Sequence, residues 1–137
     1  MDAILLIGRV LFAALFIYSG IAHITKTQAL TGYATYKKVP LAKLAVIVSG
    51  LMILVGGLYI AFGVYADLGA LLIAIFLVPT ALQMHAFWKE SDATTRQSER
   101  THFLKDISLA GGALIIFALV GAGADIGPSI TGTFFNF

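Results

Sequence analysis

The chain has 137 residues, of which 59% are hydrophobic and only 12% are charged. Soluble domains carry roughly 25% charged residues, and a chain this short cannot hide so many apolar side chains in its interior. We therefore expect lipid to cover the excess. The formal net charge of +2 and the absence of cysteine exclude a nucleic-acid binder as well as disulfides and CxxC redox motifs.

Four segments are long and apolar enough to cross a bilayer, whose hydrocarbon core of about 30 Å needs about 20 residues of helix. They lie at about residues 3–24, 41–62, 67–87 and 103–122. Asp2 stands where a signal peptide has basic residues, and the first segment contains Arg9 but no small-residue cleavage site, so we interpret this segment as a retained membrane helix. The sequence predicts an all-α integral membrane four-helix bundle, with residues 1–137 forming one domain.

The connections between these segments differ in length and polarity. Residues 25–40 contain two tyrosines and two adjacent lysines and could form a short interfacial helix at headgroup depth. Residues 63–66 form only a tight turn, so helices two and three should be antiparallel neighbours. Residues 89–101 are strongly polar, and we expect a solvated loop there. The tail, residues 123–137, should rest its aromatic end in the outer interface.

Lysine and arginine are distributed unequally between the two sides of the membrane that these helices define. The first and third connections, with the adjoining helix ends, hold eight of the nine, whereas Arg9 stands alone on the other side. Cytoplasmic loops carry the excess of positive charge. Both termini are therefore expected outside a cytoplasmic, or inner, membrane.

Arg9 lies about two turns inside the first helix, where a charge costs about 3 kcal/mol unless it is paired. At helical spacing it shares one face with Phe16, Gly20 and His23, which indicates that this face looks into the bundle. Asp67, at the outer end of the third helix, is the expected counter-ion. The alternative is that Arg9 extends its guanidinium to the outer headgroups.

A second group of polar residues falls at the inner membrane boundary. Three histidines from different helices share this depth: His23, His85 and His102. Trp88, Lys105 and Asp106 lie beside them, the two charges in the expected first turn of helix four.

Imidazole donates and accepts protons near neutral pH, so this group could bind a metal, a haem or a quinone headgroup. No HxxxH or HExxH spacing places two histidines on one helical face, and we expect no metal site. The structural alternative is that the histidines are ordinary helix-end residues and that Trp88 anchors the headgroup region. The sequence predicts a ligand site at His23, His85, Trp88, Lys105 and Asp106.

Several short groups of residues follow one another in a distinctive order: Arg9, residues 18–21, Val39 with Pro40, Gly50, residues 56–58, residues 85–88, residues 103–106, and Gly111 with Gly112. This order resembles the DoxX family of small bacterial and archaeal membrane proteins over about residues 5 to 120. The resemblance implies a four-helix membrane fold and similarity to a thiosulfate:quinone oxidoreductase subunit. The family often has Lys in place of His23, Glu in place of Ile53 and Asn in place of Asp106.

Two functions remain open at this stage. The first is a redox-associated subunit that binds a quinone, with His85 and Lys105 at the carbonyl oxygens and Asp106 or His23 relaying protons. Flavin and nucleotide motifs are absent, so electrons would come from a soluble oxidoreductase partner or a bound cofactor.

The second function is a non-catalytic membrane anchor that recruits a soluble enzyme through residues 89–101. Transport ranks last, because transporters often show paired broken helices and intramembrane carboxylates. In each case the chain contacts membrane lipid, and its oligomeric state is left open.

Overall fold

The computed structural model describes residues 1–137 and consists of helices without strands. In chain order the elements are α1 (Asp2–Thr25), α2 (Thr27–Tyr36), α3 (Ala42–Phe62), α4 (Ala66–Met84), the 3₁₀ turn η1 (Phe87–Lys89) and α5 (Ala93–Gly121). Four of them, with η1 counted as the extension of α4, are long and apolar enough to cross a membrane. The chain is an all-α multi-pass membrane protein, as the sequence predicts, and α2 is the predicted short helix between the first two spans.

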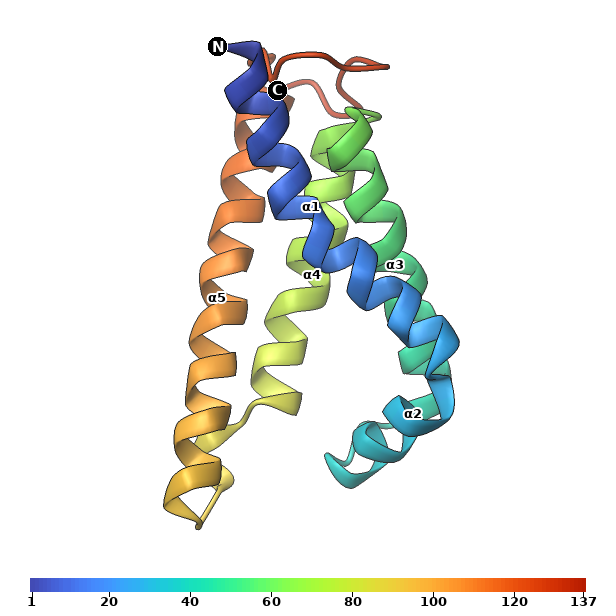
Figure 1. Cartoon of the computed structure of the whole chain (residues 1–137), viewed down its shortest axis with the longest axis vertical. Helices are drawn as coiled ribbons and strands as arrows, with labels where there is room; N and C mark the ends of the chain where they lie inside the picture. Colours follow the sequence, from blue (N-terminus) through green and yellow to red (C-terminus); the bar gives the residue numbers. More distant parts are fainter.

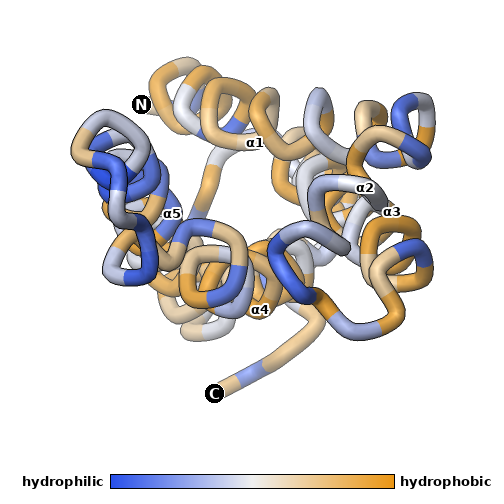
Figure 2. Tube along the Cα trace, turned by 90° about the horizontal axis from the view of Figure 1, so that it is seen from below, coloured by the Kyte–Doolittle hydropathy of each residue, from blue (hydrophilic) through white to orange (hydrophobic).

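The long helices pack in two pairs, α1 with α3 and α4 with α5, and contacts between α3 and α4 join the pairs. Figure 1 shows the two pairs diverging toward the end of the bundle that carries α2, which we call the open end. The other end carries both termini and the C-terminal tail, residues 123–137, and we call it the closed end. Seen from the open end, hydrophilic residues concentrate on the α2–α3 connection and the start of α5 (Figure 2).

Glycines set the close helix contacts near the middle and the closed end of the bundle. A Cβ atom on Gly20 of α1 would lie 2.6 Å from the Cβ of Leu54 on α3. Between α3 and α4, Cβ atoms on Gly56 and Gly69 would lie 2.8 and 2.7 Å from each other's carbonyl oxygens. These contacts hold backbones together where small residues stand, and beyond them α3 and α4 separate toward the open end.

The start of α5 corrects the sequence-based expectation. The helix begins at Ala93 and not near residue 103, so most of the expected solvated loop is helical. Asp92 caps it, since its carboxylate accepts hydrogen bonds from the Thr95 N–H at 2.8 Å and hydroxyl at 2.9 Å, which lower the pKa of Asp92. These first turns are exposed on nearly all sides and lack the apolar periodicity that marks a helix in sequence. Lys105 therefore lies about three turns into α5, not in its first turn.

Candidate functional site

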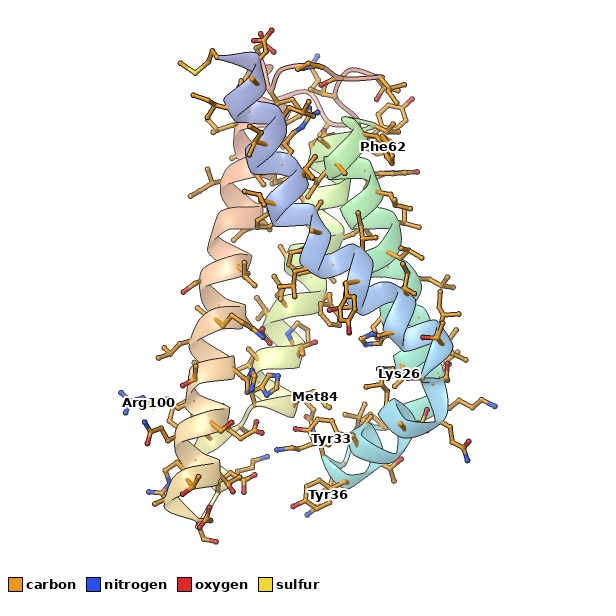
Figure 3. The ribbon with its side chains drawn as sticks, viewed as in Figure 1. Lys26, Tyr33, Tyr36, Phe62, Met84 and Arg100 are labelled. Carbon is orange, nitrogen blue, oxygen red and sulfur yellow. The ribbon has the colours of Figure 1, made fainter.

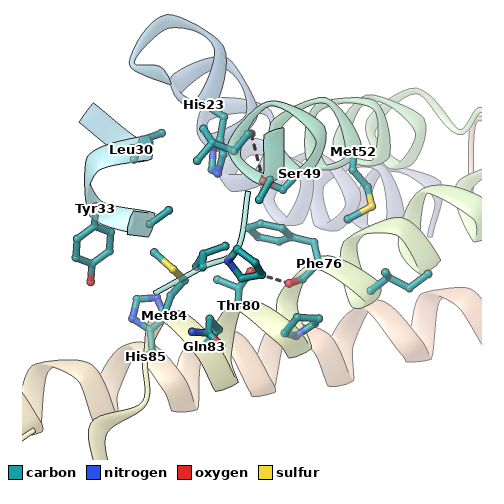
Figure 4. A pocket seen from close by; sticks show the side chains of 17 residues that line it. His23, Leu30, Tyr33, Ser49, Met52, Phe76, Thr80, Gln83, Met84 and His85 are labelled. Carbon is teal, nitrogen blue, oxygen red and sulfur yellow. Dashed lines mark hydrogen bonds between the residues drawn. The ribbon is translucent and has the colours of Figure 1, made fainter. Parts of the chain in front are cut away.

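A cavity of about 510 Å³ lies at the open end, between α2, α3 and α4. Most of its 17 lining residues are apolar, among them Leu30, Val46, Met52, Ile75 and Phe76. Its polar side chains come from four segments: His23, Tyr33, Ser49, Thr80, Gln83 and His85 (Figure 4). The helices α3 and α4, held together by glycines near the closed end, diverge toward the open end (Figure 1), where residues of α2 complete the cavity wall.

Ile75 lines the cavity from the middle of α4, and 52% of this residue is exposed. It lies in the part of α4 that is long and apolar enough to cross a membrane. The cavity wall therefore includes exposed apolar surface within a membrane-spanning helix.

His85 connects the cavity to polar residues on α5. It follows the last residue of α4, and its Nδ1 lies 2.8 Å from Glu99 Oε2 while its Nε2 lies 3.6 Å from Asp106 Oδ2. Its ring stacks on His102 with a centroid distance of 5.1 Å. Glu99, His102 and Asp106 are spaced by three and four residues, so α5 presents them on one face to His85.

Lys37 and Tyr33 connect α2 to the same face of α5. The Lys37 Nζ lies 3.3 Å from Glu90 Oε1 and 3.7 Å from Glu99 Oε2, and the Tyr33 hydroxyl donates to Glu99 at 3.4 Å. Burial and the Glu99 charge raise the pKa of Tyr33. Burial alone would lower the pKa of Lys37, but the neighbouring Tyr33, Glu90 and Glu99 outweigh it, and the pKa is raised.

Asp106 is a buried carboxylate, 5% exposed, and lies within ion-pair distance of His85 and Lys105. The Lys105 Nζ lies 3.8 Å from Asp106 Oδ1 and 3.5 Å from His102 Nδ1, on the outer surface of α5. Lys105 is about half exposed and does not line the cavity. It can act on a bound molecule only through Asp106 and His85.

The five predicted ligand residues thus occupy three different positions. His23 and His85 line the cavity, and Lys105 and Asp106 reach it only through His85. Trp88 stands apart from the cavity, 51% exposed, with its ring against Phe87 and Phe103. No three His, Asp or Glu side chains have a geometry that would hold a metal ion.

Sequence reasoning did not place Tyr33, Lys37 and Glu99 in this site. The sequence predicts a loop at Glu99, and in a loop the spacing of Glu99 to His102 and Asp106 does not put the three side chains on one face. The four-residue spacing of Tyr33 and Lys37, which puts both on one face of a helix, was the available signal.

At the closed end, Arg9 and Asp67 do not form the expected ion pair. The Arg9 guanidinium donates to the carbonyl of Pro128 at 2.6 Å, to the hydroxyl of Ser129 at 3.1 Å and to other carbonyls. The Asp67 carboxylate accepts the N–H groups of Phe134 and Phe135 at 2.9 and 2.6 Å. Both charges are buried and bind the C-terminal tail instead of each other.

The helix face that carries Arg9 is buried together with Phe16 and Gly20, which confirms that it looks into the bundle. The tail closes over it, with the Phe135 and Phe137 rings packed against Phe117 of α5. The sequence alone does not identify the partners of Arg9 and Asp67, because most of them are main-chain groups, which every residue carries.

Comparison with known proteins agrees with this architecture. The sequence profile of the DoxX family matches residues 4–86, a range that contains all 17 residues of the cavity wall. No curated protein and no solved structure matches the chain. Because the family profile covers more than half of the sequence, the chain belongs to the DoxX family.

Proposed function

We propose that the protein is a redox-associated membrane subunit that binds a quinone, or a similar lipid-soluble molecule with a polar head, in the cavity between α2, α3 and α4. The observation that carries this proposal is a mostly apolar cavity with an imidazole, His85, in its wall. A lipid-soluble ligand would enter beside Ile75, an exposed apolar residue of the same wall. The cavity volume of about 510 Å³ lies within the range of small-molecule sites.

His85 supports a role in proton exchange with the bound head group. Its two ring nitrogens face Glu99 and Asp106, and an imidazole between two carboxylates can pass protons between the cavity and the polar face of α5. Gln83, which also lines the cavity, would share the head group with His85. Lys105 and Trp88 have no direct contact with the ligand in this arrangement. Electrons would come from a partner protein or from a cofactor that it carries.

The binding test uses a tritium-labelled benzoquinone with a decyl tail and the purified protein in lipid nanodiscs. We expect saturable binding, weakened at least tenfold in His85→Ala and abolished in Val46→Trp, whose indole would fill the cavity. Val48→Trp, on an exposed face of α3, should bind like the unaltered protein. Non-saturable binding, or equal binding in all four proteins, would refute the proposal.

The second candidate function is an anchor for a soluble oxidoreductase. The observation in its favour is the polar start of α5, where residues 93–98 and Arg100 are exposed on a rigid helix. Such a helix could dock a partner through charge. Failure of the quinone titration, with recovery of a soluble oxidoreductase that binds the unaltered protein but not Arg100→Glu, would establish this function.

We also propose that the open end faces the cytoplasm and both termini face outward. The termini lie at the same end of the bundle (Figure 1), and Lys26, Tyr33 and Arg100 lie at the other (Figure 3). Because the chain has no cysteine, single cysteines at Ser98 and Thr133 can report the orientation. An impermeant thiol reagent should label intact cells at position 133 only; labelling at position 98 alone would reverse the topology.

A further inference from the structure

The hydroxyl groups of Ser49 and Thr80 in the cavity wall donate their hydrogens to main-chain carbonyls. Ser49 Oγ donates to the carbonyl of Val46 at 3.2 Å, and Thr80 Oγ1 donates to the carbonyl of Phe76 at 2.7 Å. A hydroxyl has one hydrogen and two lone pairs. Both side chains can therefore offer a ligand only an acceptor.

The histidine and tyrosine rings of the wall also direct their hydrogens to acceptors in the protein. The His23 Nδ1 lies 2.7 Å from the carbonyl oxygen of Ser19, and since a carbonyl only accepts, Nδ1 carries the hydrogen. In the neutral imidazole Nε2 then keeps its lone pair. The Nδ1 of His85 and the hydroxyl of Tyr33 are both directed to the Glu99 carboxylate, at 2.8 and 3.4 Å.

Pro79 adds a main-chain acceptor. Proline has no N–H, so the carbonyl of Ile75, four residues earlier, loses the partner that a helix supplies. Ile75 and Pro79 both line the cavity, and an unpaired carbonyl at membrane depth is costly unless something donates to it. Among the uncharged side chains of the wall, Gln83 retains a donor, because its Nε2 gives one of two hydrogens to the carbonyl of Lys37 at 2.8 Å.

The wall also carries no Asp, Glu, Lys or Arg side chain, so it favours an uncharged ligand. We infer that the cavity selects neutral amphiphiles that donate hydrogen bonds. It takes the hydroxyl form of its ligand, a hydroquinone or a long-chain phenol, in preference to a counterpart without the hydroxyl. This inference rests on the proposed function and specifies the chemical class of ligand for the same cavity.

A matched pair of probes without redox chemistry tests the preference. Binding of 4-decylphenol and of its methyl ether, 4-decylanisole, is measured by isothermal titration calorimetry on the protein in nanodiscs, with empty nanodiscs subtracted. We expect the phenol to bind at least about tenfold more tightly, because one hydrogen bond to an otherwise unpaired acceptor is worth about that factor. Under anaerobic conditions, a decyl hydroquinone should likewise exceed its quinone.

Two variants assign the preference to this cavity. Pro79→Ala restores an N–H at position 79 and gives the Ile75 carbonyl its helical partner, so the ratio of phenol to anisole affinity should fall while α4 becomes more stable. Thr80→Val removes an acceptor and should lower the ratio as well. Thr25→Val is the matched control, since Thr25 makes the same kind of hydrogen bond, to Ile21 at 3.0 Å, outside the cavity.

The outcomes separate the inference from the proposed function. Saturable and equal binding of phenol and anisole, lost in Val46→Trp, would overturn the donor preference and leave the cavity as a binding site. Absence of saturable binding for both probes and for the quinone would overturn both. A phenol preference that is unchanged in Pro79→Ala and Thr80→Val would place recognition of the hydroxyl elsewhere and overturn the inference.

Discussion

The two ends of the bundle hold their buried charges in different ways. At the closed end, Arg9 and Asp67 bond mainly to the main chain of the C-terminal tail. At the open end, Glu99 and Asp106 meet side chains, chiefly His85, beside a cavity. Main-chain partners are fixed by the fold, whereas side-chain partners can change rotamer and protonation state. The buried charges of the closed end thus have partners that the fold fixes, whereas those of the open end have partners that can rearrange.

The tail owes its position to several independent attachments. The N–H groups of Ile130 and Thr131 donate to the carbonyl of Gly63 at 3.0 and 3.1 Å, and the Thr131 hydroxyl accepts from the Tyr65 N–H at 2.8 Å. Together with Arg9, these bonds join α1, the α3–α4 turn and the tail. Removing one buried charge should therefore loosen the whole closed end.

The largest expected effect is on Asp67. In Asp67→Ala the N–H groups of Phe134 and Phe135 lose a charged acceptor inside the protein, which should lower the free energy of unfolding by about 3 kcal/mol. Asp125→Ala is the control, since Asp125 also accepts a main-chain N–H, that of Gly127 at 2.8 Å, but is exposed. Steric trapping in mixed micelles measures both. Equal losses in the two variants would contradict the distinct role of the closed end.

The second prediction concerns the packing of α1 against α3 at Gly20, which we expect to be tight although a cavity lies nearby. A methyl group on Gly20 would collide with Leu54, including its main-chain nitrogen at 2.8 Å, and overpacking of this kind costs about 2 kcal/mol. Gly20→Ala should therefore destabilise the protein by that amount. Gly8→Ala has open space around its Cβ and should gain about 0.5–1 kcal/mol in the same assay. A neutral Gly20→Ala would show that α1 and α3 adapt easily.

The fold was accessible from sequence because length and hydropathy are local properties. Three of the four predicted spans agree with the structure to within about three residues. The start of α5 was missed because exposed polar residues such as Arg96 and Arg100 have no apolar period, although the Asp92 cap marked the helix start.

The candidate site was only partly accessible, for reasons that differ at the two ends. His85 could be placed at the inner boundary from its position at a helix end, but its neighbour Glu99 depends on the helical course of residues 93–102. Asp67 could be recognised as a buried charge, but its partners are main-chain N–H groups of the tail. Such contacts depend on where the main chain of the tail runs, and the identity of the residues in the tail does not reveal this path.

The smallest expected effect concerns the link between α2 and α5, whose contribution to stability should depend on pH. The pKa of Lys37 is raised above its ordinary value of 10.5, and that of Tyr33 above 10.0. A raised pKa means that folding favours the protonated form, so the stabilisation is complete below the ordinary pKa and disappears as the pH rises through the raised pKa.

Lys37→Met, which keeps most of the aliphatic chain, should lower Tm at pH 8 by an amount corresponding to about 1 kcal/mol or less. That difference should shrink at high pH, as the pH rises through the raised pKa of Lys37 and the unaltered protein also loses the charge. Lys43→Met, at an exposed lysine without an ion pair, should leave Tm unchanged at both pH values. A Tm difference for Lys37→Met that persists undiminished at high pH would assign the effect to packing of the side chain and remove the ionic link between α2 and α5.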